Sequence, residues 1–202
     1  MEQQASPAVK RRLIMDSLPS NPIELTRLLN REPNIDTATN IVQWELGDIA
    51  EMLLLADDSW GWASKEIQLA LGAVVFQTEV IAILLHDTVF SLIFSSLDKA
   101  DFPMIESHEG AVEALLKMQS KLGRFIKHKT YSKWHPEKEN EYLVKALENL
   151  GELLLYASSL GKFVGLSNVA QLLQLGTEQV KDRIVDKQLK LGRFENYRGD
   201  VK

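Results

Sequence analysis

Apolar residues recur at spacings of three and four along most of this chain. The clearest example is a single stripe formed by Leu143, Leu147, Leu150, Leu154 and Ala157. A stripe with this spacing lies on one face of an α-helix and packs as the seam of a helical bundle. No segment sustains the period-two alternation that indicates a strand. The pattern therefore predicts an all-α protein with a four-helix-bundle core and extra short helices at both ends.

Prolines and capping residues divide the chain into the expected helices. Residues 1–20 are expected to be irregular, and Asn21-Pro22 then opens a short helix. Pro136 opens another helix after a polar loop, and the largest break is expected at 101–103. The expected helices are 21–31, 36–56 with Asp36 as its cap, 64 to beyond 86, 107–128 and 136–161, followed by two short helices capped by Ser167 and Thr177.

The most apolar segment, residues 67–94, is expected to be a buried core helix. Its apolar run is interrupted by Gln77, Glu79, His86 and Asp87, so it lacks the roughly 18 uncharged residues that suit a membrane span. The N-terminal region has basic residues but no apolar core, unlike a signal peptide. A membrane is therefore not expected among the partners of this chain.

The dipeptide Leu-Gly recurs inside four expected helices, at Gly47, Gly72, Gly123 and Gly151. Glycine inside a helix costs about 1 kcal/mol relative to alanine, and close approach of a neighbouring helix is the natural compensation. The recurrence favours an internal duplication of 36–95 and 107–161 within one domain, 21–202. Because seven of the eleven glycines follow a leucine, a chance recurrence stays open.

Composition narrows the classes of partner. The 202-residue chain has a net charge of −5 and no cysteine. It therefore has no overall positive field, and nucleic acid is not expected as a partner. The lack of cysteine excludes disulfides, thiolate metal sites and cysteine nucleophiles, and it suits the cytoplasm, where we expect the protein to be located.

Three stretches resemble one known family. ENLGELLLYASSLGKFVGLS (148–167) is similar to the second motif helix of the MazG-like all-α NTP pyrophosphohydrolases, and WELGDIAEM (44–52) is similar to the first. VKDRIVDKQLKLGRFENYRGD (180–200) resembles the ending of many members. The resemblance implies a helical bundle of MazG-like type that hydrolyses a nucleoside triphosphate, as a ribo- or deoxynucleotide, to the monophosphate and pyrophosphate.

The resemblance also implies a metal site. Family members hold Mg²⁺, with Mn²⁺ as an alternative, on acids three residues apart, which share a helix face and offer the oxygen ligands that this cation prefers. The metal would activate water and neutralise phosphate charge. The metal-ligand candidates in this chain are Glu45, Asp48, Glu148 and Glu152.

The chain departs from the family's acidic pattern at several positions. In the first half, the second acid pair falls on Ala70 and Ala73; in the second half, the first pair falls on Lys121 and Arg124. Two hypotheses follow. Either Glu45 and Asp48 join Glu152 in one site assembled from both halves, or Lys121 and Arg124 replace the metal and form an ion pair with Glu152. We favour the ion pair for the second half.

Lys121, Arg124, Lys127 and Asn149 are the candidate substrate-binding residues, because the first three belong to a local basic cluster that could contact phosphates. The expected partners are a nucleoside triphosphate and a second copy of the chain in a homo-oligomer, most simply a dimer. The competing hypothesis is a helical bundle that has lost catalysis and acts as an oligomeric structural or partner-binding protein.

Overall fold

The computed structural model describes residues 6–29, 32–55, 60–85 and 103–191. Within these ranges the chain is helical and contains no strand, which confirms the all-α prediction. The elements are α1 (Pro7–Ser17), α2 (Pro22–Leu28), α3 (Ile35–Leu55), α4 (Trp60–Leu85), α6 (His108–Trp134), the 3-10 turn η1 (Pro136–Lys138), α7 (Glu139–Phe163) and α8 (Val169–Leu191).

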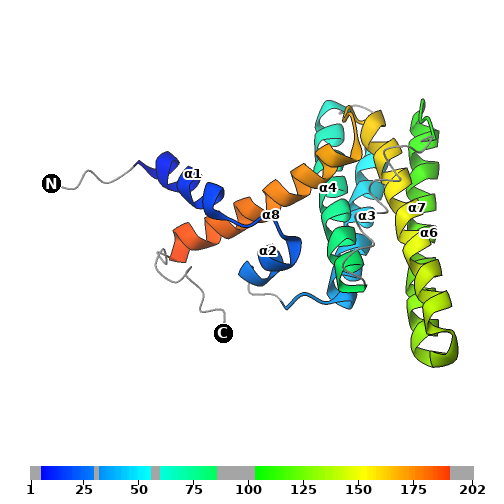
Figure 1. The fold of residues 1–202 in the computed structure, drawn as a ribbon. Helices are drawn as coiled ribbons and strands as arrows, with labels where there is room; N and C mark the ends of the chain where they lie inside the picture. The colour runs from blue at the N-terminus through cyan, green and yellow to red at the C-terminus, as the bar shows by residue number, and fades with distance from the viewer. Residues whose placement is uncertain (1–5, 30–31, 56–59, 86–102, 192–202) are drawn as a thin grey trace.

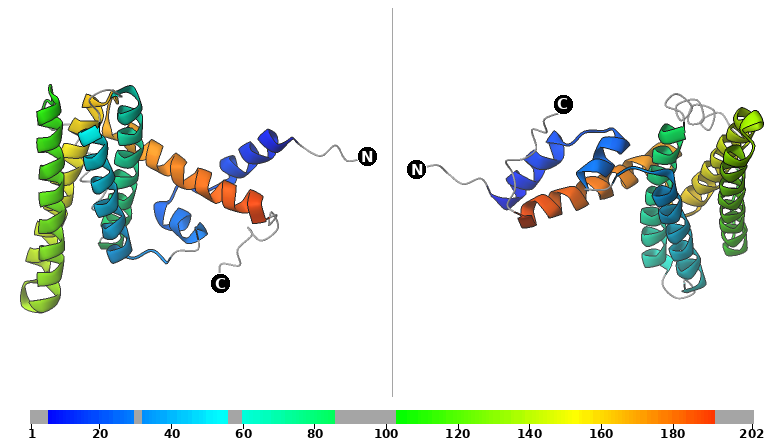
Figure 2. Two further views of the ribbon diagram at one scale, coloured as in Figure 1. Left: turned by 180° about the vertical axis from the view of Figure 1, so that it is seen from behind. Right: turned by 90° about the horizontal axis from the view of Figure 1, so that it is seen from below.

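Two antiparallel hairpins, α3–α4 and α6–α7, form the bundle (Figure 1). α3 packs against α6 and α4 packs against α7, whereas α3 and α7 lie diagonally opposite and their backbones do not approach closely. α8 crosses α4 and then runs away from the bundle, with α1 and α2 beside it (Figure 2). This order of helices determines which candidate residues can meet.

Burial of apolar stripes holds the bundle together. Leu150, Leu154 and Ala157 of the predicted stripe are buried, while Leu143 and Leu147 are half-buried. A core residue of this size contributes about 1.5–3 kcal/mol when it leaves water. The largest fully buried side chains include Leu46, Ile49, Leu71, Phe76, Ile81, Met118, Phe125 and Leu153.

The helix starts follow side-chain capping. Asn21 accepts hydrogen bonds from the backbone N–H groups of Ile23 and Glu24, as predicted. Ser107 likewise caps α6. The predicted cap at Asp36 is wrong, because Asn34 Oδ1 accepts the backbone N–H of Thr37 at 2.7 Å and α3 begins at Ile35. Asp36 is left free to pair with Lys129 of α6.

Both ends of the chain correct the sequence expectations. The segment 1–20 is not irregular throughout, because Ser6 caps α1 and Arg11 bonds Asp182 and Asp186 of α8 at 2.6 and 2.5 Å. The two short helices expected after residue 167 are one continuous helix, α8, with Thr177 in its interior. Tertiary contacts with α1, α2 and α4 therefore stabilise a longer helix than local capping predicted.

Two helix boundaries in the middle of the chain also differ from the sequence expectation. α6 continues through the segment 131–134 that was expected to be a polar loop, so only His135 and η1 separate it from α7. α4 already runs from Trp60, so Ser64 does not start it. The expected extension past His86 and the break at 101–102 lie outside the described residues.

The glycines divide into two kinds. A Cβ added to Gly176 would lie 2.1 Å from the carbonyl oxygen of Gly72, so α4 and α8 cross with their backbones in contact. The predicted close approach is therefore right for Gly72. It is wrong within this chain for Gly47 and Gly123, where an added Cβ would meet nothing within 4 Å.

α4 is long and apolar enough to span a membrane by length and composition. However, 61% of its most apolar 18-residue window is buried inside the protein. Its apolar surface is covered by α3, α7 and α8. α4 is thus packed as a core helix of the bundle, which confirms the prediction for residues 67–85, while residues 86–94 lie outside the described residues.

Candidate functional site

The first pair of candidate metal ligands lies on α3. Glu45 is half-buried and Asp48 is exposed. Burial raises the pKa of Glu45, and the neighbouring Asp48 raises it further, while Arg183 of α8 lowers it. Arg183 was not among the predicted site residues, although it lies in the K-D-R stretch that resembles the family's ending. The α3 acids are therefore one carboxylate pair with a cation nearby.

The second hairpin contains the predicted ion pair. Lys121 of α6 bonds the carboxylate of Glu152 of α7, with the lysine side chain only 15% exposed and the glutamate 48% exposed. Burial lowers the pKa of Lys121, and the nearby cations Arg124 and Lys117 lower it further. The predicted ion pair between Lys121 and Glu152 is confirmed, and the Glu152 carboxylate bonds a cation of the chain itself.

The remaining candidates on α7 have separate surroundings. Asn149 is buried, and its side-chain Nδ2 donates to the backbone carbonyl of Lys145 at 2.5 Å, so it faces its own helix. Glu148 is exposed and acts on His128 of α6 through its charge. Neither residue lies with the α3 acids.

The four predicted acids thus form two groups on helices that are not adjacent in the bundle. α3 carries Glu45 and Asp48, α7 carries Glu148 and Glu152, and the two helices are diagonal in the bundle. Among the residues that the structure describes, no three His, Asp or Glu side chains gather closely enough to hold a metal ion. The hypothesis of one site assembled from both halves required Glu45, Asp48 and Glu152 to lie together. Among the described residues, these three side chains do not gather in this way.

The basic cluster continues into a group of rings where α6 turns into α7. Lys127 lies 5.4 Å from the ring centroid of Tyr131, and Lys145 lies 5.7 Å from that of Tyr142. Tyr131 packs edge-on against Tyr142 at 5.6 Å. Burial lowers the pKa of His128, and the surrounding cations lower it further. The rings and cations mainly contact one another, and these contacts stabilise the end of the α6–α7 hairpin.

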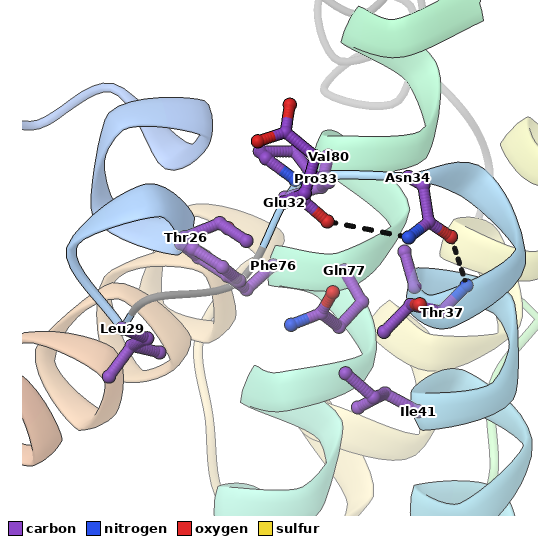
Figure 3. A pocket seen from close by; sticks show the side chains of 11 residues that line it. Thr26, Leu29, Glu32, Pro33, Asn34, Thr37, Ile41, Phe76, Gln77 and Val80 are labelled. Atoms are coloured by element: carbon purple, nitrogen blue, oxygen red, sulfur yellow. Dashed lines mark hydrogen bonds between the residues drawn. The ribbon is translucent and has the colours of Figure 1, made fainter.

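One small, partly open pocket lies between α2, α3 and α4 (Figure 3). Asn34 is one of its lining residues, and its side chain donates to the backbone carbonyl of Glu32 at 3.3 Å and accepts from the backbone N–H of Thr37. Its volume is about 20 Å³, which is room for about one water molecule. A nucleotide cannot enter this pocket.

A larger opening lies along the outer side of α3 and α6. It is a groove of about 340 Å³ lined by Gln43, Leu46, Gln119, Leu122, Gly123 and Ile126. Trp44 is 67% exposed, Leu116 58% and Ile126 39%, and all three belong to the two helices that form the groove. We use the name α3–α6 face for the groove together with the exposed surface of the two helices beside it, which includes Trp44 on α3 and Leu116 and Ile126 on α6.

Sequence reasoning missed the α3–α6 face because helix periodicity places Trp44 and Leu116 off the buried stripes but does not distinguish an interaction surface from an ordinary exposed one. The usable indication was Gly47 and Gly123, which interrupt two helices without an internal neighbour. Comparison of the chain with protein-family models, with curated proteins and with solved structures found no match.

Proposed function

We propose that this protein is a non-catalytic helical bundle that acts by binding another protein chain through the α3–α6 face. The observation that carries the proposal is the groove between α3 and α6, with Trp44 and Leu116 more than half exposed. Apolar surface gathered around a groove is typical of a protein interaction site. Aromatic side chains such as Trp44 often supply much of the binding energy at such sites.

The candidate acids support this function over hydrolysis. A MazG-like site needs carboxylates free to hold Mg²⁺, but the Glu152 carboxylate bonds the ammonium group of Lys121. Ala70 and Ala73 occupy the other acid positions of the first half and offer no oxygen ligand. The side chains at these positions do not fit a four-carboxylate magnesium site.

The experiment is pyrophosphate release from a panel of ribo- and deoxynucleoside triphosphates with Mg²⁺ or Mn²⁺, with EDTA as the control. We expect no metal-dependent release. A cation that binds only the folded state must raise the melting temperature. We therefore also expect that neither cation raises the melting temperature of this protein. Metal-dependent release that disappears in both Glu45→Ala and Glu152→Ala would instead establish a pyrophosphohydrolase and overturn the proposal.

A further inference from the structure

The exposed surfaces of α3 and α6 are built alike. On each helix, a glycine lies one turn from an exposed charge and within about two turns of an exposed apolar side chain. Residues three and four apart share a helix face, so these side chains point the same way. They are Trp44, Gly47 and Glu51 on α3, and Leu116, Gly123 and Lys127 on α6.

The two glycines leave space that nothing in this chain fills. An added Cβ at Gly47 or Gly123 would meet no atom within 4 Å. Glycine in an exposed helix interior costs about 1 kcal/mol relative to alanine. The buried crossing of Gly72 with Gly176 illustrates how this chain uses glycine where two helices come together. The α3–α6 face offers the same backbone access to a helix from outside.

The charges on the two helices are opposite. α3 contains four carboxylates and no Lys or Arg, giving a net charge of −4. α6 contains six Lys or Arg and two Glu, giving a net charge of +4. A partner that presents one uniform charge would therefore attract one helix and repel the other. A partner with one acidic and one basic helix fits both.

The opposition holds position by position. When α3 and α6 are aligned on Gly47 and Gly123, three of the four acids of α3 fall on cations of α6, and Asp36 falls on Val112. The aligned pairs are Glu45 with Lys121, Asp48 with Arg124, and Glu51 with Lys127. The last two pairs are exposed, whereas Glu45 is half-buried and Lys121 bonds Glu152 within the chain. The exposed charges of each of these two helices are therefore complementary to those of the other helix.

We propose that the partner chain is a second copy of this protein, joined by a two-fold axis that sets α3 of each copy on α6 of the other. This inference rests on the proposed function and names its partner. A two-fold interface must be self-complementary, with residue i contacting j and j contacting i, and the paired charges of α3 and α6 meet that condition. Gly47 and Gly123 let the helix backbones approach closely.

The size of the face is sufficient for a stable dimer. α3 has 21 residues and α6 has 27. At about 1.5 Å per residue, the shared face is roughly 30 Å long. It is two helices wide, with helices that pack about 8–10 Å apart. Such an area is comparable with the roughly 800 Å² per partner of an ordinary specific interface.

A charge-swap experiment tests the arrangement. One variant reverses the α3 charges (Asp48→Lys with Glu51→Lys), and the other reverses the α6 charges (Arg124→Glu with Lys127→Glu). Sedimentation velocity over a dilution series measures the mass of each variant alone and of an equimolar mixture. The matched controls, Lys65→Glu on α4 and Glu178→Lys on α8, reverse exposed charges away from the face.

We expect a wild-type dimer and an unchanged dimer in both controls. Each reversed variant alone sets like charges against each other, so its dissociation constant should rise at least about tenfold. The mixture should recover the dimer, because α3 of one variant then meets an oppositely charged α6 of the other. A monomeric wild type, variants that dimerise as the wild type does, or a mixture that stays monomeric would each overturn the inference.

Gly47→Ala and Gly123→Ala provide a second test that does not depend on charge. Both variants keep the fold, because the added methyl group meets no atom of the chain. We expect weaker dimerisation together with a higher melting temperature of the monomer. Unchanged dimerisation would contradict the placement of the glycines in the contact. The pyrophosphate assay remains independent, so a monomeric wild type without turnover separates failure of this inference from failure of the proposed function.

Discussion

Where α4 crosses α8, Gly72 and Gly176 bring two backbones into contact, and a Cβ on Gly176 would also lie 2.9 Å from Cβ of Phe76. On the α3–α6 face, Gly47 and Gly123 have open space around them. The same Leu-Gly pattern therefore serves a contact inside the chain in one region and leaves a surface available in the other. A mid-helix glycine indicates a close contact, but the sequence does not say whether the contacting helix belongs to the same molecule.

The largest expected effect comes from filling the internal crossing. Gly176→Ala should destabilise the protein by about 3 kcal/mol, because the new methyl group meets backbone atoms of α4 that cannot rotate away. Urea unfolding followed by far-ultraviolet circular dichroism would measure the loss. A change of less than about 1 kcal/mol would mean that the crossing can open without cost, and the contrast between the two regions would fail.

The contribution of the packed side of α4 to the free energy of unfolding should also depend on pH. Burial raises the pKa of Glu79, two turns from Gly72, to about 7, above its ordinary value of 4.5. As the pH rises from 4.5 to 7, the unfolded chain releases this proton while the folded chain retains it, so the free energy of unfolding falls in that window. Glu79→Gln should remove most of this pH dependence and increase stability at pH 8 by about 2 kcal/mol.

Urea unfolding of wild type and Glu79→Gln at pH 5 and pH 8 would check the effect. Glu66→Gln is the matched control, since it makes the same change on the same helix at a residue that is also half-buried. Equal pH slopes in Glu79→Gln and the wild type would show that Glu79 is ionised in the folded protein without penalty.

On the open side, filling the glycines should have the opposite sign. Gly123→Ala should stabilise the isolated monomer by about 0.4–1 kcal/mol, because the methyl group meets no atom and the unfolded chain loses freedom. Unfolding at a concentration where the protein is monomeric would measure the gain. Destabilisation there would show that Gly123 has a neighbour inside the chain.

The smallest effect is expected at the ion pair of the second hairpin. Glu152→Gln should cost about 1 kcal/mol or less, because the Glu152 side chain is 48% exposed and water screens the attraction to Lys121. A double-mutant cycle with Lys121→Met would isolate the interaction energy. A coupling of zero would mean that the Lys121–Glu152 pair does not stabilise the second hairpin.

The helical class, the core stripe around Leu150 and the cap at Asn21 could be predicted because they depend on spacing and local hydrogen bonding. The Lys121–Glu152 pair was also predictable, because opposite charges at motif positions of neighbouring helices attract each other. α1 and the unbroken α8 could not be predicted, because each is stabilised by the other through Arg11 and Asp182. Such contacts join residues far apart in the sequence.

The sequence by itself determined that this chain is an all-α bundle and which side chains could carry charge or pack. The tertiary structure alone decided which acids meet, because α3 and α7 are diagonal and a helix order cannot be read from helix periodicity. It also decided which apolar residues stay outside. Trp44 and Leu116 lie off the buried stripes of α3 and α6, and the arrangement of the neighbouring helices leaves that side of each helix exposed to solvent.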